Sequence, residues 1–94
     1  MPYILIKHTV RDYETLEGVF KADAERRRLG GSKGARIFKT DGEAPEYFVL
    51  FDWDDAERAR TFADSYELRE ATEWAGDAAP TKAVIMEEIL TTDA

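Results

Sequence analysis

The stretch that decides the fold is Glu46 to Ser65, EYFVLFDWDDAERARTFADS. Its first half, Tyr47 to Trp53, is aromatic, aliphatic or β-branched at every position except Asp52, which is typical of a strand buried on both faces. Asp54 follows as a candidate N-cap with Glu57 three residues later. Apolar residues then recur at helical spacing: Ala56, Ala59, Phe62 and Ala63. The stretch therefore predicts a central strand that leads into a helix within two residues.

The segments upstream predict a strand and a helix. Tyr3 to Val10 is rich in β-branched and aromatic residues and contains no Gly or Pro, which predicts a strand. After Asp12, a candidate N-cap, apolar residues follow at a spacing of three to four, as in an amphipathic helix. We expect this helix to end at the cationic run Arg26–Arg28 and to stop at Gly30-Gly31.

Three further segments complete the predicted order. Ala35 to Thr40 alternates weakly and predicts an edge strand, which a turn at Asp41-Gly42 joins to the central strand. The helix after the central strand is expected to break near Ser65, which can cap a second short helix that ends at Gly76. Thr81 to Leu90 predicts the last strand.

This order of elements predicts one α+β domain, residues 1–94, of the ferredoxin-like βαββαβ type. Right-handed crossovers place the first and third strands in the middle of a four-stranded antiparallel sheet with the helices on one face. The central strand nevertheless carries apolar residues on both faces, with Phe51 and Trp53 on one and Phe48 and Leu50 on the other. We therefore expect a homodimer packed sheet to sheet around an enclosed space, because a bare apolar face would be exposed to water.

Composition excludes several function classes. The 94 residues include 20 acidic and 13 basic side chains, a formal net charge of -7, which opposes binding to a nucleic-acid backbone. The absence of cysteine excludes disulfides and thiolate metal sites. The first residues lack the features of a signal peptide, and no run approaches the roughly 18 apolar residues of a membrane span. We expect a cytoplasmic protein without nucleic-acid or membrane partners.

Several stretches resemble the dimeric α+β barrel proteins of the antibiotic-biosynthesis monooxygenase type, including small members labelled as cyclases. The similar stretches are IKHTV with DYETLEGVF, GSKGARIF, and VLFDWDDAERARTFADSYELREA, which together cover most of the chain. The resemblance implies a homodimer with a ligand-sized cavity in each subunit. Members that oxidise phenols or quinols need no metal or flavin, because an electron-rich substrate reacts with oxygen itself, so we expect no cofactor. Some of these enzymes use an Asn in the pocket, and this chain has none.

His8 is the candidate catalytic residue. It is the only histidine, and in the first predicted strand it shares a side with Ile4, Ile6 and Val10. At the centre of a dimer it could point into the cavity and act as a base or a hydrogen-bond donor. The alternative is a partly buried histidine held by a carboxylate or carbonyl near the dimer interface. No spacing of acidic residues indicates a metal site around it.

Five aromatic residues are candidates for binding the substrate. Tyr47, Phe51 and Trp53 share one face of the central strand and could line a pocket for a flat apolar compound. Tyr66 and Trp74, on the predicted short helix, could close its mouth. The alternative is that aromatic residues at this spacing are ordinary core, dimer or surface contacts.

Two basic stretches of the sequence can each be explained either by structure or by function. The Arg26–Arg28 run is expected to be a solvated helix end, with an anionic substrate as the alternative. The glycines around Ser32-Lys33 are only superficially like a phosphate loop, because they follow a helix instead of leading from a strand into a helix start.

Two functions from different classes remain open. The first is a cofactor-independent monooxygenase or cyclase-like protein that acts on an aromatic or polyketide-like compound. The second is a non-catalytic ligand-binding or stress-response dimer.

Overall fold

The computed structural model describes residues 2–8, 12–74 and 83–94, with residues 67–74 described by their backbone alone. The elements in chain order are β1 (Pro2–His8), α1 (Tyr13–Ala22), α2 (Ala24–Gly30), β2 (Ser32–Lys39), β3 (Tyr47–Trp53), α3 (Ala56–Trp74) and β4 (Val84–Glu87). These strands form one antiparallel sheet in the order β2-β3-β1-β4. The predicted ferredoxin-like α+β fold, with the first and third strands in the middle, is confirmed.

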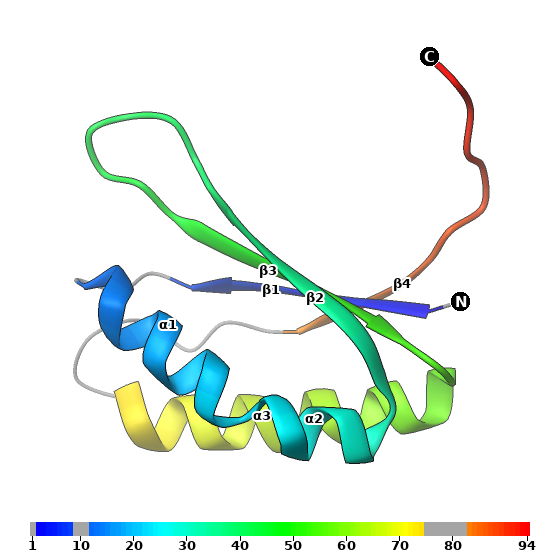
Figure 1. Cartoon of the computed structure of the whole chain (residues 1–94), viewed down its shortest axis with the longest axis horizontal. Helices are drawn as coiled ribbons and strands as arrows, with labels where there is room; N and C mark the ends of the chain where they lie inside the picture. Colours follow the sequence, from blue (N-terminus) through cyan, green and yellow to red (C-terminus); the bar gives the residue numbers. More distant parts are fainter. Residues whose placement is uncertain (1, 9–11, 75–82) are drawn as a thin grey trace.

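The three helices lie on the same side of the sheet (Figure 1). On the helix side, Ile4, Ile6 and His8 of β1 lie opposite Phe51, Val49 and Tyr47 of β3. Five of these six side chains are fully buried, and Tyr47 is 9% exposed. The four aliphatic and aromatic side chains Ile4, Ile6, Val49 and Phe51 pack with Trp53 against one stripe of α3 formed by Ala59, Ala63 and Tyr66. The core of the protein is therefore the layer between the helices and this face.

The opposite face of the sheet carries apolar side chains that no described helix covers. In the β1–β3 register, Tyr3, Leu5 and Lys7 lie opposite Asp52, Leu50 and Phe48. All six are only partly buried. We call this surface the open face.

The helices differ from the predicted ones in two places. The first predicted helix is kinked at Asp23 into α1 and α2, although hydrogen bonds continue from the Asp23 amide to the Val19 carbonyl and from the Arg27 amide to the Asp23 carbonyl. The predicted break near Ser65 is wrong, because α3 continues to Trp74. No Gly or Pro interrupts α3, and a lone Ser is tolerated within a helix. Gly76, the predicted stop, lies outside the described residues.

The strands also differ at their ends. β2 begins at Ser32 instead of Ala35, because an irregularity between Ser32 and Gly34 lets this segment pair with the end of β3. β1 ends at His8, and residues 9–11 lie outside the described residues. β4 covers only Val84–Glu87, and residues 88–94 extend from it without regular structure.

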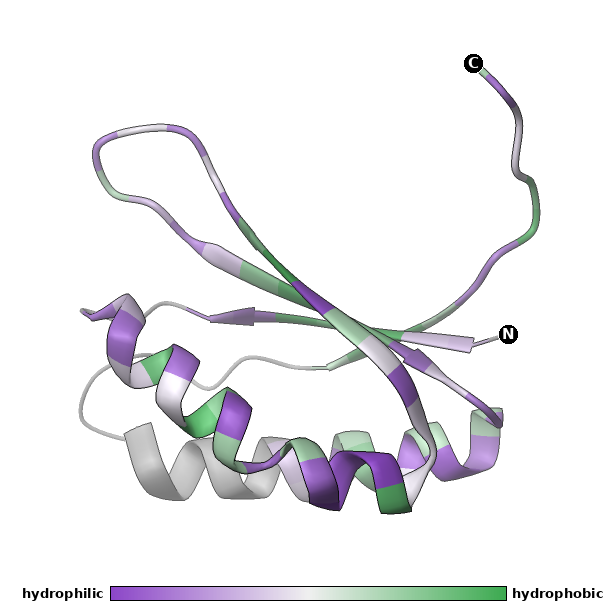
Figure 2. Ribbon diagram, in the orientation of Figure 1, coloured by the Kyte–Doolittle hydropathy of each residue, from purple (hydrophilic) through white to green (hydrophobic). Residues whose placement is uncertain are grey.

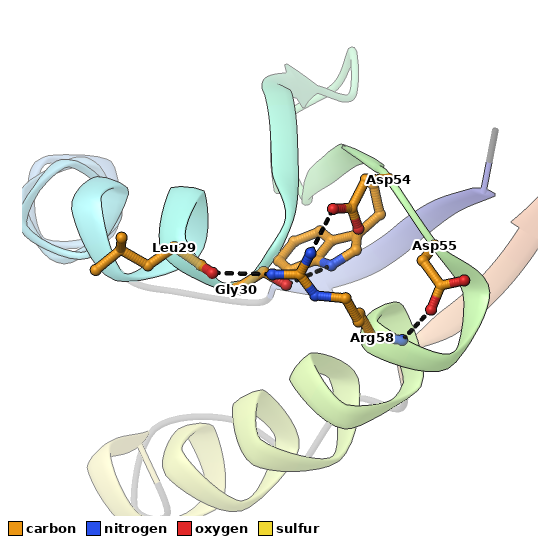
Figure 3. A network of polar contacts seen from close by, with 6 residues as sticks. Leu29, Gly30, Asp54, Asp55 and Arg58 are labelled. Atoms are coloured by element: carbon orange, nitrogen blue, oxygen red, sulfur yellow. Dashed lines mark hydrogen bonds and ion pairs between the residues drawn. The ribbon is translucent and has the colours of Figure 1, made fainter.

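The junction from β3 to α3 is held by polar contacts that also reach α2 (Figure 3). Asp55, and not Asp54 as expected, caps α3, since its Oδ2 accepts a hydrogen bond from the Arg58 amide at 3.1 Å. Asp54 instead pairs with the Arg58 side chain at 2.6 Å. The same guanidinium donates to the Leu29 carbonyl at 3.0 Å. The start of α3 is therefore tied to the end of α2.

No helix in the described part of the chain is both long and apolar enough to cross a membrane.

Candidate functional site

A buried polar pair joins β1 to α3. The Tyr66 hydroxyl lies 2.9 Å from Nε2 of His8, with the two rings edge to face and their centroids 5.7 Å apart. His8 is fully buried and Tyr66 is 6% exposed. Which of the two groups donates depends on the imidazole tautomer. Tyr66 is placed here because it continues the core-facing stripe of Ala59 and Ala63 along α3.

An aromatic layer adjoins this pair at Tyr66. The Phe51 ring is its centre, with the rings of Phe20, Phe62, Trp53 and Tyr66 at centroid distances between 5.4 and 6.2 Å. Trp53 is fully buried, lies 4.4 Å from the Phe62 ring and donates its indole N–H to the Gly30 carbonyl at 3.1 Å. Trp53 is thus an enclosed core residue, and its side chain does not line an opening at the end of β3.

Four of the five predicted aromatic site residues lie on the same side of the sheet as His8: Tyr47, Phe51, Trp53 and Tyr66. Tyr66 belongs to the long helix α3 instead of a separate short helix. Trp74 is the last residue of α3, and its side chain lies outside the described residues.

The side occupied by His8 corrects one expectation. His8 faces the described helices, whereas the open face lies on the other side of the sheet. A site built on His8 therefore lies between the sheet and the helices, and not on the open face.

A cleft of about 300 Å³ opens at the end of the sheet beside Tyr47, and Tyr13, Ile37 and Lys39 complete its lining. The Tyr13 and Tyr47 rings lie 5.2 Å apart. Partial burial, followed by the charge of Glu17 and a hydrogen bond to its carboxylate, raises the pKa of the Tyr13 hydroxyl. Tyr47, which lines this cleft, is the residue of β3 that lies opposite His8 in the sheet.

Sequence reasoning missed Arg27. Arg26 and Arg28 are exposed, as expected of a solvated helix end, but Arg27 is only 5% exposed. Its guanidinium stacks 4.1 Å from the Phe20 ring centroid and 5.5 Å from that of Phe51. The spacing of seven residues between Phe20 and Arg27, two helical turns, was the available signal, because it places both on one face.

Comparison with known proteins gives one informative likeness. No family model matches the chain, and no curated protein matches it. Among solved structures, the chain is similar to the R26S mutant of MhuD, crystallised with two manganese protoporphyrin IX molecules bound per active site. The TM-score is 0.61 at 17% identity, over 99% of this chain and 98% of that chain. This likeness shows the fold. Activity and ligand have to be argued from this chain's own residues.

Proposed function

We propose that the protein is a cytoplasmic small-molecule-binding homodimer of the antibiotic-biosynthesis monooxygenase type, which binds an aromatic or polyketide-like compound on the helix side of each sheet. The observation that carries the proposal is the His8–Tyr66 pair, a buried polar contact beside an aromatic layer. Apolar walls with few convergent polar groups are the usual character of a small-molecule site. The cleft at Tyr47, the residue opposite His8 in the sheet, supplies the opening.

The pair suits chemistry on a phenol or an enol. Tyr66 orients the His8 imidazole, which then accepts the substrate hydroxyl proton and leaves an electron-rich phenolate. The phenolate reacts with molecular oxygen at a ring carbon to form a peroxide, and loss of water from that peroxide gives a quinone. The overall change, phenol plus O₂ to quinone plus water, balances without an external reductant. The aromatic layer contributes by excluding water.

A second copy on the open face completes the proposed assembly. Leu5, Phe48 and Leu50 form an apolar strip there, and on the same face the Phe38 and Val84 side chains are 48% exposed. The tail beyond β4 adds Ile89 and Leu90, which are 92% and 77% exposed. Figure 2 shows a hydrophobic stretch in this tail, drawn in green. Pairing of two such faces would bury this apolar surface.

The porphyrin bound to MhuD is not carried over to this chain. Iron or manganese in a porphyrin takes an axial ligand such as a histidine nitrogen. His8 is the chain's only histidine, and it is fully buried with Nε2 engaged by Tyr66. We propose a reaction that depends on the substrate's own electrons.

Oxygen uptake tests the catalytic step. Untagged protein would be mixed with a panel of naphthols, hydroquinones and anthrones, and oxygen consumption would be followed with an electrode. The proposal expects quinone formation by the wild type, loss of turnover in His8→Ala, and an unchanged oligomeric state. Turnover that survives His8→Ala would remove His8 from the mechanism.

The second candidate function is a non-catalytic ligand-binding dimer. The complete burial of His8 favours it, because a histidine bonded to Tyr66 within the core is already accounted for as structure. The two candidates separate in the same experiment: saturable binding of an aromatic compound without oxygen uptake identifies the non-catalytic protein.

A further inference from the structure

Arg27 is a buried cation with few protein partners. Its guanidinium has five N–H donors. In the described part of the chain its one hydrogen bond runs from Nη1 to the Phe20 carbonyl, at 2.7 Å. Asp23 acts on it only as a nearby charge and pairs instead with Arg26 at 3.5 Å. Burial is the main effect on Arg27 and lowers its pKa from the usual value.

Burying a guanidinium with so few hydrogen-bond acceptors around it is unfavourable unless an anion binds to it. A guanidinium remains protonated when it is buried, because its intrinsic pKa is too high for neutralisation. The faces of Phe20 and Phe51 attract the cation but accept no conventional hydrogen bond from its edge. The planar fork of N–H groups at that edge matches the two oxygens of a carboxylate.

A cleft beside Arg27 has the charge and size for an anionic group. It measures about 220 Å³ and lies between α2 and the start of β2. Its lining contains three cationic side chains, although the whole chain has a net charge of -7, and one of the three, Arg28, is already paired with Glu25. The Gly34 Cα faces open space, with no atom within 4 Å of the position where a Cβ would lie. The lining residues are Ala24, Arg27, Arg28, Ser32, Lys33, Gly34 and Ala35.

One aromatic ring, that of Phe51, lies near both Arg27 and the proposed site. Phe51 contacts the Arg27 guanidinium on one side, and its centroid lies 6.2 Å from the Tyr66 ring on another. Tyr66 in turn holds His8. The two basic motifs of the sequence, the arginine run and Ser32-Lys33, therefore meet at one end of the aromatic layer whose other end holds the polar pair.

We propose that Arg27 is the anchor for the carboxylate of an aromatic acid, with Lys33 at the rim of the same cleft. The inference rests on the proposed function, because the acid is taken to be the aromatic compound of that function. It adds the substrate's charge: the ligand is an anion, held by a bidentate contact at Arg27.

The test compares 2-naphthoate with neutral 2-naphthamide by isothermal titration at low salt. We expect wild-type protein to bind the naphthoate about tenfold more tightly, since a charged bidentate contact is lost with the amide. Arg27→Met should remove this preference. The matched control is Arg26→Met, one position earlier on the same helix, exposed and lining a different cleft, which should keep it. Arg27→Lys should give an intermediate preference, because a lysine keeps the charge without the fork.

Circular dichroism shows whether the Arg27 variants fold. If they do not, Lys33→Met at the exposed rim takes their place, and a weaker affinity for naphthoate with unchanged affinity for naphthamide is then expected. Equal binding of the two probes by wild-type protein would overturn this inference and leave the proposed function standing, whereas binding of neither would overturn both. Binding of inorganic phosphate without naphthoate would replace the aromatic acid by a phosphate ligand and overturn the assignment to a carboxylate.

Discussion

The Tyr66 hydroxyl and the Nε2 atom of His8 lie 2.9 Å apart, although 58 residues separate them in the chain. Tyr66→Phe removes this contact and leaves the imidazole nitrogen without its partner in a dry layer, so we expect a loss of about 1–3 kcal/mol in the free energy of unfolding. Urea denaturation measures this loss in the free energy of unfolding. In a double-mutant cycle with His8→Phe, the two effects should couple by about 1 kcal/mol. Additive effects would contradict an energetic link between the two residues.

Gly31 should not tolerate a side chain. It ends α2 with a φ of 122°, and a Cβ there would lie 2.7 Å from the Trp53 Nε1 atom and even closer to the Asp54 carboxylate. We expect Gly31→Ala to lower the free energy of unfolding by about 1–3 kcal/mol. The matched control is Gly18→Ala, which lies within α1 with no atom within 4 Å of the Cβ position and should stabilise by about 0.5–1 kcal/mol. Equal effects of the two substitutions would contradict the tight junction between α2 and β3.

The raised pKa of the Tyr13 hydroxyl predicts how the stability of the protein changes at alkaline pH. Its pKa is raised in the folded protein, so between the unfolded value near 10 and the higher folded value the unfolded chain binds fewer protons than the folded one. The contribution of Tyr13 is therefore fully present below pH 10 and is lost as pH rises through the folded pKa. Melting temperatures from pH 8 to 11 should fall more steeply for wild type than for Tyr13→Phe. If the melting temperatures of the two proteins fell in parallel with pH, the raised pKa of Tyr13 would be contradicted.

The proposed homodimer predicts a strong effect at Leu50, which lies opposite Leu5 in the middle of the open face. Leu50→Lys places a charge where two sheets would meet, so a dimeric wild type should become monomeric while the fold is kept. Sedimentation velocity measures the mass. The control is Leu29→Lys on α2, where the side chain is 72% exposed and away from this face. A wild-type monomer, or a Leu50→Lys dimer, would contradict sheet-to-sheet pairing.

The sequence predicted the sheet well because β3 is unambiguous: seven residues, strand-forming except for Asp52, followed at once by a capped helix allow few topologies. Period-two alternation also placed His8 on the side of Ile4 and Ile6. Which side the helices cover could not be predicted, because both faces of β3 are apolar and alternation looks the same in either case. Because the helices cover the side that carries His8, this residue lies between the sheet and the helices and not in the expected space between two sheets.

Arg27 shows a second limit of sequence reasoning. Three consecutive arginines at a helix end are normally solvated, and only the exact rotation of α2 turns the middle one onto Phe20 and Phe51. That rotation depends on the kink at Asp23 and on the contacts of Arg58 with Asp54 and Leu29. The cap of α3 shifted for a similar reason, since Asp54 is drawn into this network and Asp55 takes its role. The spacing of Phe20 and Arg27 indicates a shared helix face, but the contacts with Phe51 and between Arg58 and Leu29 are long-range and leave no local pattern.

The most direct test of the central claim, that a small aromatic molecule binds beside His8, is an NMR titration of the imidazole. His8 is the only histidine in the 94 residues, so its ring signals in untagged protein need no assignment. Adding a hydroxylated naphthoic acid should shift these signals saturably, and the shift should weaken in Arg27→Met. Binding of the same compound, measured by calorimetry, with unmoved His8 signals would place the ligand elsewhere and contradict the account.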